Sequence, residues 1–371
     1  MQVRVVTQSP QYSGLSATTM SAKDEQAGTD ADARLRPPVV VITGASAGVG
    51  RAIADAFAAR GWRVALIARG HERLVAAQAE IARQAAAALI FSVDVSDATA
   101  LEQAAATIAT TWGGIDIWIN NAMATMFAPF EEMPAADFKR VVEVTFLGQV
   151  NGTRAALKHM RRRELGTIVQ VNSALAVRSI PLQSAYCAAK AAVRGFSDAL
   201  RSELLHEKSR IRVTDVYLPA VNTPQFDWAR SLLPRRLRPV APVFQPETIA
   251  AAIVSAALNA PRETWIGRPT AEAMLGNAAV PGWLDRWLAR KAWSGQMTQE
   301  PAPHPRMGNL YEPVQADVAA HGRFDDGSRY HVHAYRPSRV RLGLLLAALS
   351  LGLLGLRAAT APGRRSGMRS T

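Results

Sequence analysis

The chain has 371 residues, of which 49% are hydrophobic and 20% are charged, and its formal net charge is +13. These proportions are ordinary for a globular protein, and they exclude a mainly disordered chain, a collagen and a disulfide scaffold. Because Cys187 is the single cysteine, no internal disulfide can form, which fits the reducing cytoplasm as the location of the folded domain.

The basic excess is spread along the chain and is not gathered into a binding stripe. It comes from 37 arginines and six lysines. Residues 1–36 are neutral, residues 301–371 hold ten arginines against four acidic residues, and the rest of the surplus is diffuse. The sequence has no zinc-finger spacing, basic-aromatic RNA motif or heptad-linked basic region, so we expect no nucleic-acid partner.

Alternating strands and helices are predicted from Val39 onward, after a flexible leader at residues 1–36. The predicted strands cover residues 39–43, 62–68, 89–93, 115–119, 167–171, 211–218 and 264–266. The predicted helices cover residues 49–59, 71–87, 97–112, 135–160, 184–206 and 246–258. This alternation indicates an α/β fold in one domain over residues 37–300: a Rossmann-like, doubly wound parallel sheet of about seven strands with helices on both faces.

A glycine-rich turn follows the first predicted strand. Its residues are Gly44, Ala45, Ser46, Ala47, Gly48, Val49 and Gly50. Glycines let the backbone approach a pyrophosphate, and the N-terminus of the next helix offers unpaired N–H groups with a partial positive charge. The spacing is G-x-x-x-G-x-G, and a purely structural turn is the alternative. The position between the first strand and the first helix of a βαβ unit favours dinucleotide binding.

The ends of the second and third strands bear on the identity of the dinucleotide. The second strand ends before Arg69, whose planar guanidinium can pair with the 2′-phosphate of NADP, whereas NAD is commonly held by an acidic residue there. A solvated arginine at a helix start is the alternative, and Ala47 lacks the basic side chain often seen with NADP. The third strand ends in Asp94 and Val95, and Asp94 can accept from an adenine amino group. We therefore expect NADP(H) in preference to NAD(H).

Three polar side chains form a candidate acid–base group. Ser173 follows the predicted strand 167–171, and Tyr186 and Lys190 share one face of the helix 184–206 because they are four residues apart. A nearby ammonium is expected to lower the pKa of the Tyr186 phenol, which can then exchange a proton with a carbonyl or alcohol oxygen held by Ser173. An ordinary amphipathic helix that carries one tyrosine and one lysine is the alternative.

Over residues 37–270 the chain resembles the short-chain dehydrogenase/reductases. The resemblance is carried by Thr43–Gly50, Asp94-Val95, Asn120-Asn121-Ala122, Ser173, Tyr186-x-x-x-Lys190 and Pro219-x-x-x-Thr223. It implies a carbonyl–alcohol oxidoreductase with Tyr186 as general acid/base, Ser173 positioning the substrate carbonyl and Lys190 also holding the nicotinamide ribose. It implies further that Asn121 lies near the cofactor, and that Thr223, after Pro219, meets the nicotinamide carboxamide. We expect a small-molecule substrate and a homo-oligomer.

Two positions depart from the family pattern. Met123 stands where the family's Asn-Asn-Ala-Gly motif has its glycine, which adds bulk at a place of close approach. Thr145 stands where many members carry an asparagine that holds a proton-relay water for the lysine, and we carry the relay role over to its hydroxyl. These departures keep a second hypothesis open, a catalytically weak NADP-binding regulator or scaffold on the same fold.

The segments after the motifs bear on the substrate. Residues 222–244 are expected to cover it, and Phe226 and Trp228 indicate either an apolar substrate contact or packing of this cover. Residues 281–293 predict an amphipathic helix that packs on the domain, contacts another subunit or rests on a membrane. We expect no metal, since His321, His331 and His333 have no companion ligands at convincing spacing.

The C-terminal part is predicted to hold an irregular linker at residues 301–339 and an apolar segment within residues 340–371. Residues 342–356 contain nine leucines and no charged residue, and Arg341 and Arg357 flank them. As a helix this stretch would be about 22 Å long, shorter than the ~30 Å hydrocarbon core of a bilayer. We favour membrane attachment; burial against the domain or another subunit is the alternative.

Overall fold

The computed structural model describes residues 36–302, 308–315, 319–338 and 340. The described residues from Pro38 onward form one compact unit. The leader expected at residues 1–36, apart from Arg36, and the apolar segment at 342–356 lie outside the described residues, so the predicted membrane contact through that segment stays a prediction. Across the described ranges, no helix is long and apolar enough to cross a membrane.

An eight-stranded sheet in the order β15-β12-β7-β6-β4-β1-β2-β3 forms the centre of the unit. All neighbouring strands run parallel except β15, which is antiparallel to β12. The strands are β1 (Val39–Thr43), β2 (Arg63–Ala68), β3 (Ala88–Ser92), β4 (Ile117–Asn120), β6 (Thr167–Ser173), β7 (Arg212–Leu218), β12 (Glu263–Ile266) and β15 (Ala334–Tyr335). β1 is a β-branched run buried along its whole length, as expected for a strand covered on both faces.

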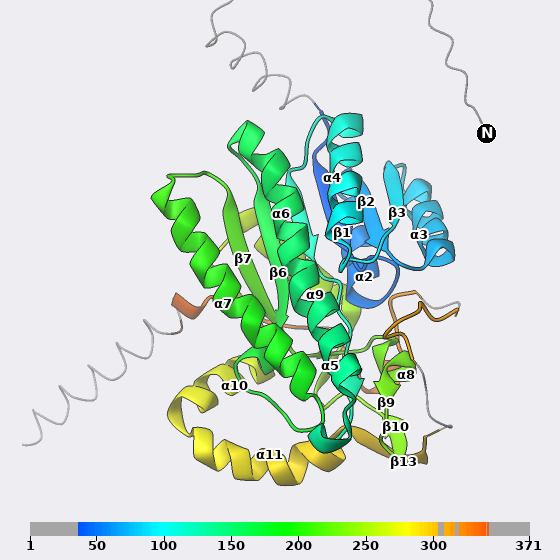
Figure 1. The fold of residues 1–371 in the computed structure, drawn as a ribbon, viewed down its shortest axis with the longest axis vertical. Helices are drawn as coiled ribbons and strands as arrows, with labels where there is room; N and C mark the ends of the chain where they lie inside the picture. The colour runs from blue at the N-terminus through cyan, green and yellow to red at the C-terminus, as the bar shows by residue number, and fades with distance from the viewer. Residues whose placement is uncertain (1–35, 303–307, 316–318, 339, 341–371) are drawn as a thin grey trace, which may run out of the picture. The chain divides into compact units, whose positions relative to one another are not determined.

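Helices cover both faces of this sheet (Figure 1). The helices are α2 (Gly48–Ala58), α3 (His71–Arg83), α4 (Ala98–Trp112), α5 (Ala135–Val142), α6 (Gly148–Met160), α7 (Ser184–His206), α8 (Gln225–Trp228), α9 (Pro246–Asn259), α10 (Arg268–Ala279) and α11 (Pro281–Gly295). One buried cluster joins α2, α3 and α9 to the sheet, and a second joins α4, α5, α6 and α7 to the opposite face. The predicted doubly wound fold is therefore confirmed.

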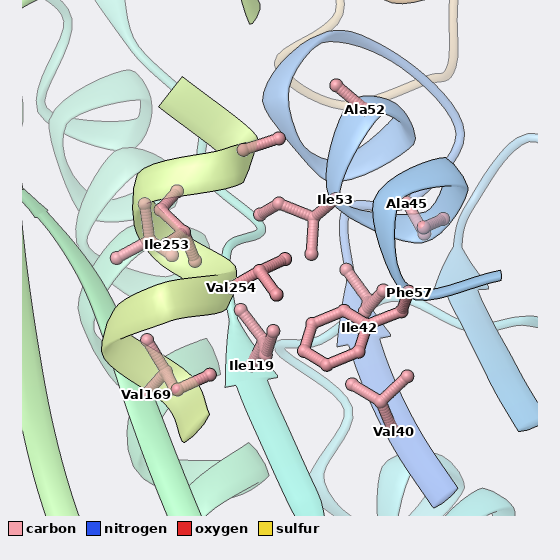
Figure 2. Packing of buried hydrophobic residues seen from close by; sticks show 14 of the residues in the cluster. Val40, Ile42, Ala45, Ala52, Ile53, Phe57, Ile119, Val169, Ile253 and Val254 are labelled. Carbon is pink, nitrogen blue, oxygen red and sulfur yellow. The ribbon is translucent and has the colours of Figure 1, made fainter. Parts of the chain in front are cut away.

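The layer beneath α2 and α9 anchors the strand end that carries the glycine-rich turn (Figure 2). Ile53 and Phe57 of α2 and Val254 of α9 meet above Ile42 of β1 and Ile119 of β4, and all five side chains are buried. Burial of a side chain of this size contributes about 1.5–3 kcal/mol. The start of α2 is thus held firmly against the sheet.

Short strands outside the main sheet shape the surface beyond the carboxyl ends of the central strands. They are β5 (Met126–Phe127), β8 (Ala220–Val221), β9 (Arg230–Ser231), β10 (Arg235–Leu237), β11 (Val243–Phe244), β13 (Met297–Pro301) and β14 (Ser328–Arg329). β5 pairs with β9, β10 pairs with β13, and β11 lies between β8 and β14. Residues 222–244, expected to cover the substrate, are therefore tied to the body of the domain by several short pairings.

Besides the short strands outside the main sheet and α8, the structure differs from the predicted elements in three places. The helix predicted over residues 135–160 is present, but a π-helical turn at Glu143–Leu147 interrupts its regular α-helical hydrogen bonding between α5 and α6. At this break Gly148 packs so closely on Val95 that an added Cβ would lie 2.5 Å from its Cγ2 atom. The helix α10 was not predicted, and the eighth strand β15 comes from a region expected to be irregular.

Candidate active site

A cavity of about 650 Å³ opens at the carboxyl ends of the central strands, where doubly wound sheets bind their ligands. Most of the predicted site residues line it, namely Gly44, Ser46, Ala47, Gly48, Val49, Arg69, Asp94, Val95, Asn121, Ser173, Tyr186, Lys190, Pro219 and Thr223. Ala45, Gly50 and Thr145 are not among the lining residues. The fold thus brings together, from distant parts of the sequence, nearly all the residues that the motifs single out.

The glycine-rich turn has a backbone that only small residues allow. Gly44 and Gly48 have φ angles of +68° and +58°, in the left-handed region that disfavours other residues. Gly50 packs against the turn itself, since an added Cβ would lie 2.2 Å from the Gly44 carbonyl oxygen. Asn121 holds the turn in place, because its Nδ2 donates to the carbonyls of Thr43 at 3.0 Å and Gly44 at 3.3 Å.

The N-terminus of α2 is suited to an anion. No side chain caps this helix, and no acidic residue lies in its first turn. The partial positive charge and the N–H groups of the first turn therefore meet no carboxylate of the helix itself. One of these groups, the Gly48 N–H, donates to the Ala319 carbonyl at 3.0 Å. The uncapped start and the close backbone together fit the pyrophosphate of a dinucleotide.

The acid–base group is assembled as the spacing predicts. Tyr186 and Lys190 face the cavity from α7, and the Lys190 ammonium nitrogen lies 5.7 Å from the centre of the Tyr186 ring. Lys190 is buried and its Nζ donates to the Val171 carbonyl at 2.6 Å. Ser173 at the end of β6 is hydrogen-bonded with the Tyr186 hydroxyl, and its Oγ also accepts from the Leu175 N–H at 3.1 Å.

Burial sets the charge states in this group. Desolvation raises the pKa of the Tyr186 phenol above its usual value, and the hydrogen bond with Ser173 opposes that rise only in part. Desolvation also lowers the pKa of the Lys190 amine to about 7, against the attraction of Asp215. The expectation that a lysine cation lowers the pKa of Tyr186 is therefore wrong for this structure, because burial disfavours the charged form of both groups.

Thr145 does not present a free hydroxyl to the cavity. It is fully buried at the π-helical turn, its Oγ1 donates to the Ala124 carbonyl at 2.7 Å, and it accepts from the Ala124 N–H at 2.9 Å. A hydroxyl has one proton to donate, and here that proton serves the backbone. The position expected to relay protons is thus occupied by a side chain that braces the segment after Asn121.

The predicted adenosine end of the cavity carries a contact that the sequence did not reveal. The Arg69 guanidinium donates to the backbone carbonyls of Asn309, Leu310 at 3.2 Å and Tyr311 at 2.8 Å. Arg69 is therefore not the solvated arginine of the alternative interpretation. Residues 309–311 belong to the region expected to be an irregular linker, and this segment forms a wall through Asn309, which lines the cavity.

Asp94 is also engaged by protein groups. Burial alone would raise its pKa, but hydrogen bonds from the Ser96 N–H at 2.9 Å, the Ser96 hydroxyl at 2.8 Å and the Arg140 guanidinium outweigh burial and lower the pKa below its usual value. Asp94 is thus a carboxylate held beside the cavity. Arg140 also donates to the Leu310 carbonyl at 3.2 Å, which joins this carboxylate to the same wall.

The motifs do not account for the part of the cavity beside α11, where apolar side chains lie together with polar ones such as Lys291 and Gln296. Leu284, Trp287 and Leu288 of α11 line it together with Phe127 and Phe226. Phe226 contacts Phe127 with ring centres 6.3 Å apart, so it serves both packing and the cavity wall. The amphipathic pattern over residues 281–293 was the available signal, but it did not show that the apolar face looks into the site.

The described residues contain no cluster of ligating side chains that could hold a metal ion. His321 instead lies between two carboxylates, with Nδ1 2.7 Å from Asp325 and Nε2 2.8 Å from Glu247. These hydrogen bonds outweigh burial and raise the pKa of the histidine. The chemistry available in the cavity is therefore that of an anion-binding turn, a buried phenol and a buried amine.

Comparison with known proteins agrees with this site. A family model described as short chain dehydrogenase matches residues 38–231. The uncharacterized oxidoreductase YxnA of Bacillus subtilis is 31% identical over 331 residues, 88% of this chain and 91% of that protein. The fatty acyl-CoA reductase of Acinetobacter baylyi is 34% identical over 62% of this chain and 77% of that protein.

A solved structure extends the likeness to the fold. It is an alcohol dehydrogenase from Thermococcus sibiricus complexed with 5-hydroxy-NADP, with 27% sequence identity and a TM-score of 0.53 over 62% of this chain and 95% of that chain. The family match covers more than half of the sequence and includes the turn, Ser173, Tyr186 and Lys190. The chain belongs to the short-chain dehydrogenase/reductase family, whose members are oxidoreductases that bind a nicotinamide cofactor.

Proposed function

We propose that the protein is an NADP(H)-preferring reductase that interconverts an apolar carbonyl compound and its alcohol. The observation that carries the proposal is one cavity that holds an uncapped, glycine-rich helix start at one end and the hydrogen-bonded Ser173 and Tyr186, with Lys190, further in. The turn would hold the pyrophosphate, Lys190 the nicotinamide ribose and Thr223 the carboxamide. When bound, the reduced nicotinamide supplies the hydride.

The residues of the chain supply the proton and the orientation. The Tyr186 phenol, kept protonated by burial, donates its proton to the carbonyl oxygen, while the Ser173 hydroxyl holds that oxygen in place. The product is the alcohol, and the phenolate left on Tyr186 regains a proton from solvent before the next turnover. In the reverse direction, the same phenolate takes the proton of the alcohol.

The walls of the cavity support an apolar substrate. Leu284, Leu288 and Phe226 line the same cavity as Tyr186 and offer apolar contacts to a hydrocarbon chain. Charged side chains, those of Arg178, Glu272 and Lys291, line it as well. The reductase of Acinetobacter baylyi that this chain resembles is named for a fatty acyl-CoA. For this protein we propose only that the substrate carries an apolar chain, as a fatty acyl compound does.

Loss of NADPH absorbance with aliphatic aldehydes and ketones of increasing chain length tests this proposal. We expect kcat/KM to rise with each added methylene until the cavity is filled, by up to about fourfold per group, because a buried CH₂ contributes about 0.8 kcal/mol. Cofactor binding without turnover of any carbonyl would contradict the proposal. It would favour the alternative, a catalytically weak NADP-binding regulator or scaffold, which the engaged hydroxyl of Thr145 supports.

Replacement of Arg69 by glutamine tests the preference for NADP(H). A hydrogen bond to a charged group contributes about 1.5–3 kcal/mol, so we expect the KM for NADPH to rise about 10- to 100-fold while the KM for NADH changes little. Steady-state kinetics with both cofactors measure this. The proposal requires Arg69 to use N–H groups beyond those donated to residues 309–311, or to exchange those carbonyls for the 2′-phosphate.

A matched control distinguishes the contact of Arg69 with the 2′-phosphate from its contact with residues 309–311. Tyr311 is part of the same segment, and its hydroxyl donates to Asp137 at 2.8 Å, so Tyr311→Phe loosens the wall without removing the guanidinium. We expect this variant to shift both KM values alike. Arg69 would have no part in cofactor choice if Arg69→Gln also shifted both values alike.

A further inference from the structure

Helix α11 presents an aromatic and cationic face to the outside of the domain. Trp283, Arg286, Trp287, Arg290 and Trp293 follow the i, i+3, i+4, i+7, i+10 pattern and so share one side of the helix, which we call the α11 outer face. Its tryptophans are 59%, 46% and 44% exposed. All eight tryptophans of the chain lie in the described ranges, and the other five are buried or half-buried. Exposed indole rings are thus confined to this helix.

The cations of the α11 outer face are available for a partner. Arg286 and Arg290 are exposed, and neither has an ion-pair or hydrogen-bond partner among the residues that the structure describes. The acidic residue of the helix, Asp285, is engaged by the Arg178 guanidinium, which also donates to Asn277 at 3.2 Å. The outer face therefore combines three exposed indoles with two exposed guanidinium groups.

The opposite side of the same helix is a wall of the cavity. Leu284 and Leu288 are half-buried and Ala292 is buried, and these three residues line the cavity at i, i+4 and i+8. Trp287 lines the cavity and is also exposed, so it marks the place where the apolar interior reaches the surface. The ring of Trp287 stacks on that of Trp283, with centres 6.3 Å apart. Figure 1 shows α11 along the lower edge of the domain.

We propose that the α11 outer face docks on an anionic lipid surface and sets the mouth of the cavity against it. Tryptophan and arginine are the side chains that settle at a membrane–water interface, where indoles enter the headgroup region and guanidinium groups meet lipid phosphates. The exposed guanidinium groups on the face and the net charge of +13 are complementary to an anionic surface. A helix that lies in the plane of the membrane interface need not be long enough to cross the bilayer.

Docking of the α11 outer face would place the mouth of the cavity at the lipid surface from which an apolar substrate could enter. An apolar carbonyl compound partitions into lipid, and a cavity that opens beside Trp287 would admit it without passage through water. This step rests on the proposed function, whereas the docking itself rests only on the α11 outer face. The two are therefore tested by separate measurements.

Fluorescence quenching by brominated lipids tests the docking on the full chain. We expect vesicles of phosphatidylcholine with phosphatidylglycerol to quench the tryptophans of α11, and pure phosphatidylcholine vesicles or added salt to weaken the quenching. The double variant Trp283→Ala/Trp293→Ala should lose most of this quenching and bind anionic vesicles about tenfold or more weakly, because two of the three interfacial anchors are gone. Quenching of these tryptophans reports whether α11 lies in the lipid, even if another segment of the chain also binds the vesicle.

The control variant is Leu205→Ala/Leu258→Ala, which removes two exposed apolar side chains elsewhere on the domain and should leave the quenching unchanged. Absence of quenching in the unmodified protein, or equal quenching in the double tryptophan variant, would overturn the proposal. So would a dimer that the double variant dissociates without any lipid quenching, since a second copy of the chain would then cover the face. Carbonyl turnover without quenching would support the proposed function and contradict the docking. Quenching without turnover would support the docking and contradict the proposed function.

Discussion

Replacement of Tyr186 by phenylalanine is expected to lower kcat for carbonyl reduction by about 10²- to 10⁴-fold, the range that general acid–base catalysis contributes. The phenol faces the cavity, is hydrogen-bonded with Ser173 and carries the proton that the proposed mechanism transfers to the carbonyl oxygen. The ring itself remains in the variant, so NADPH affinity should stay nearly unchanged. Single-turnover reduction and a fluorescence titration with NADPH measure the two quantities separately.

The neighbouring Cys187 offers a matched control on the same turn of α7. Its side chain is buried, its Sγ lies 4.0 Å from the Ile180 carbonyl, and it does not line the cavity. Cys187→Ala should therefore change kcat by no more than a few-fold. Retention of full turnover by Tyr186→Phe would remove Tyr186 from the mechanism, and loss of NADPH binding would point to a disturbed site.

The raised pKa of Tyr186 favours one direction of the reaction. Because burial holds the phenol protonated near neutral pH, the group is ready to donate a proton to a carbonyl oxygen. Oxidation of an alcohol needs the phenolate, whose formation burial opposes. If Tyr186 is the acid of the proposed mechanism, we expect alcohol oxidation to require a higher pH than carbonyl reduction.

The parts of the site that the sequence reveals are local. The glycine-rich turn lies within eight residues, and Tyr186 and Lys190 are one helical turn apart. Each of these features follows from the geometry of one element and its spacing. Their assembly follows from the parallel sheet, because the carboxyl ends of its strands meet at one edge.

The parts that the sequence does not reveal depend on contacts between distant segments. Arg69 meets carbonyls about 240 residues away in the chain, and backbone acceptors leave no side-chain pattern to read. In the sequence, Thr145 stands at the position of a relay residue. Its hydrogen bond to the Ala124 carbonyl depends on how the π-helical turn packs, which the sequence does not show. The charge of Lys190 likewise depends on its burial, which a spacing of four residues does not determine.

Replacement of Lys190 by methionine is expected to stabilise the protein against unfolding at acidic pH more than at alkaline pH. Burial lowers the pKa of this amine from 10.5 to about 7 in the folded protein. Between these values the unfolded chain binds a proton that the folded protein lacks, so the stability of the unmodified protein rises with pH across this range. Below about pH 7 the folded protein bears the full cost of a buried ammonium, and methionine removes that cost.

The size of the change follows from the same shift. One pKa unit corresponds to about 1.4 kcal/mol, so the advantage of Lys190→Met in the free energy of unfolding should be about 3–5 kcal/mol larger at pH 6 than at pH 10. The Val171 carbonyl keeps a donor in the variant, because Gln149 Nε2 also donates to it at 3.3 Å. Turnover should be lost, since the amine faces the cavity beside Tyr186.

Urea unfolding of both proteins at several pH values measures this difference, and the subtraction removes groups that titrate in both. Asp215, whose pKa burial raises to about 7 against the attraction of Arg201, is coupled to Lys190, so its contribution cancels only in part. Lys139→Met is the control, since it removes a lysine whose side chain is 77% exposed. If the difference in free energy of unfolding between Lys190→Met and the unmodified protein does not vary with pH, the buried amine keeps its proton on folding. The folded protein would then hold the ammonium that the sequence predicts beside Tyr186.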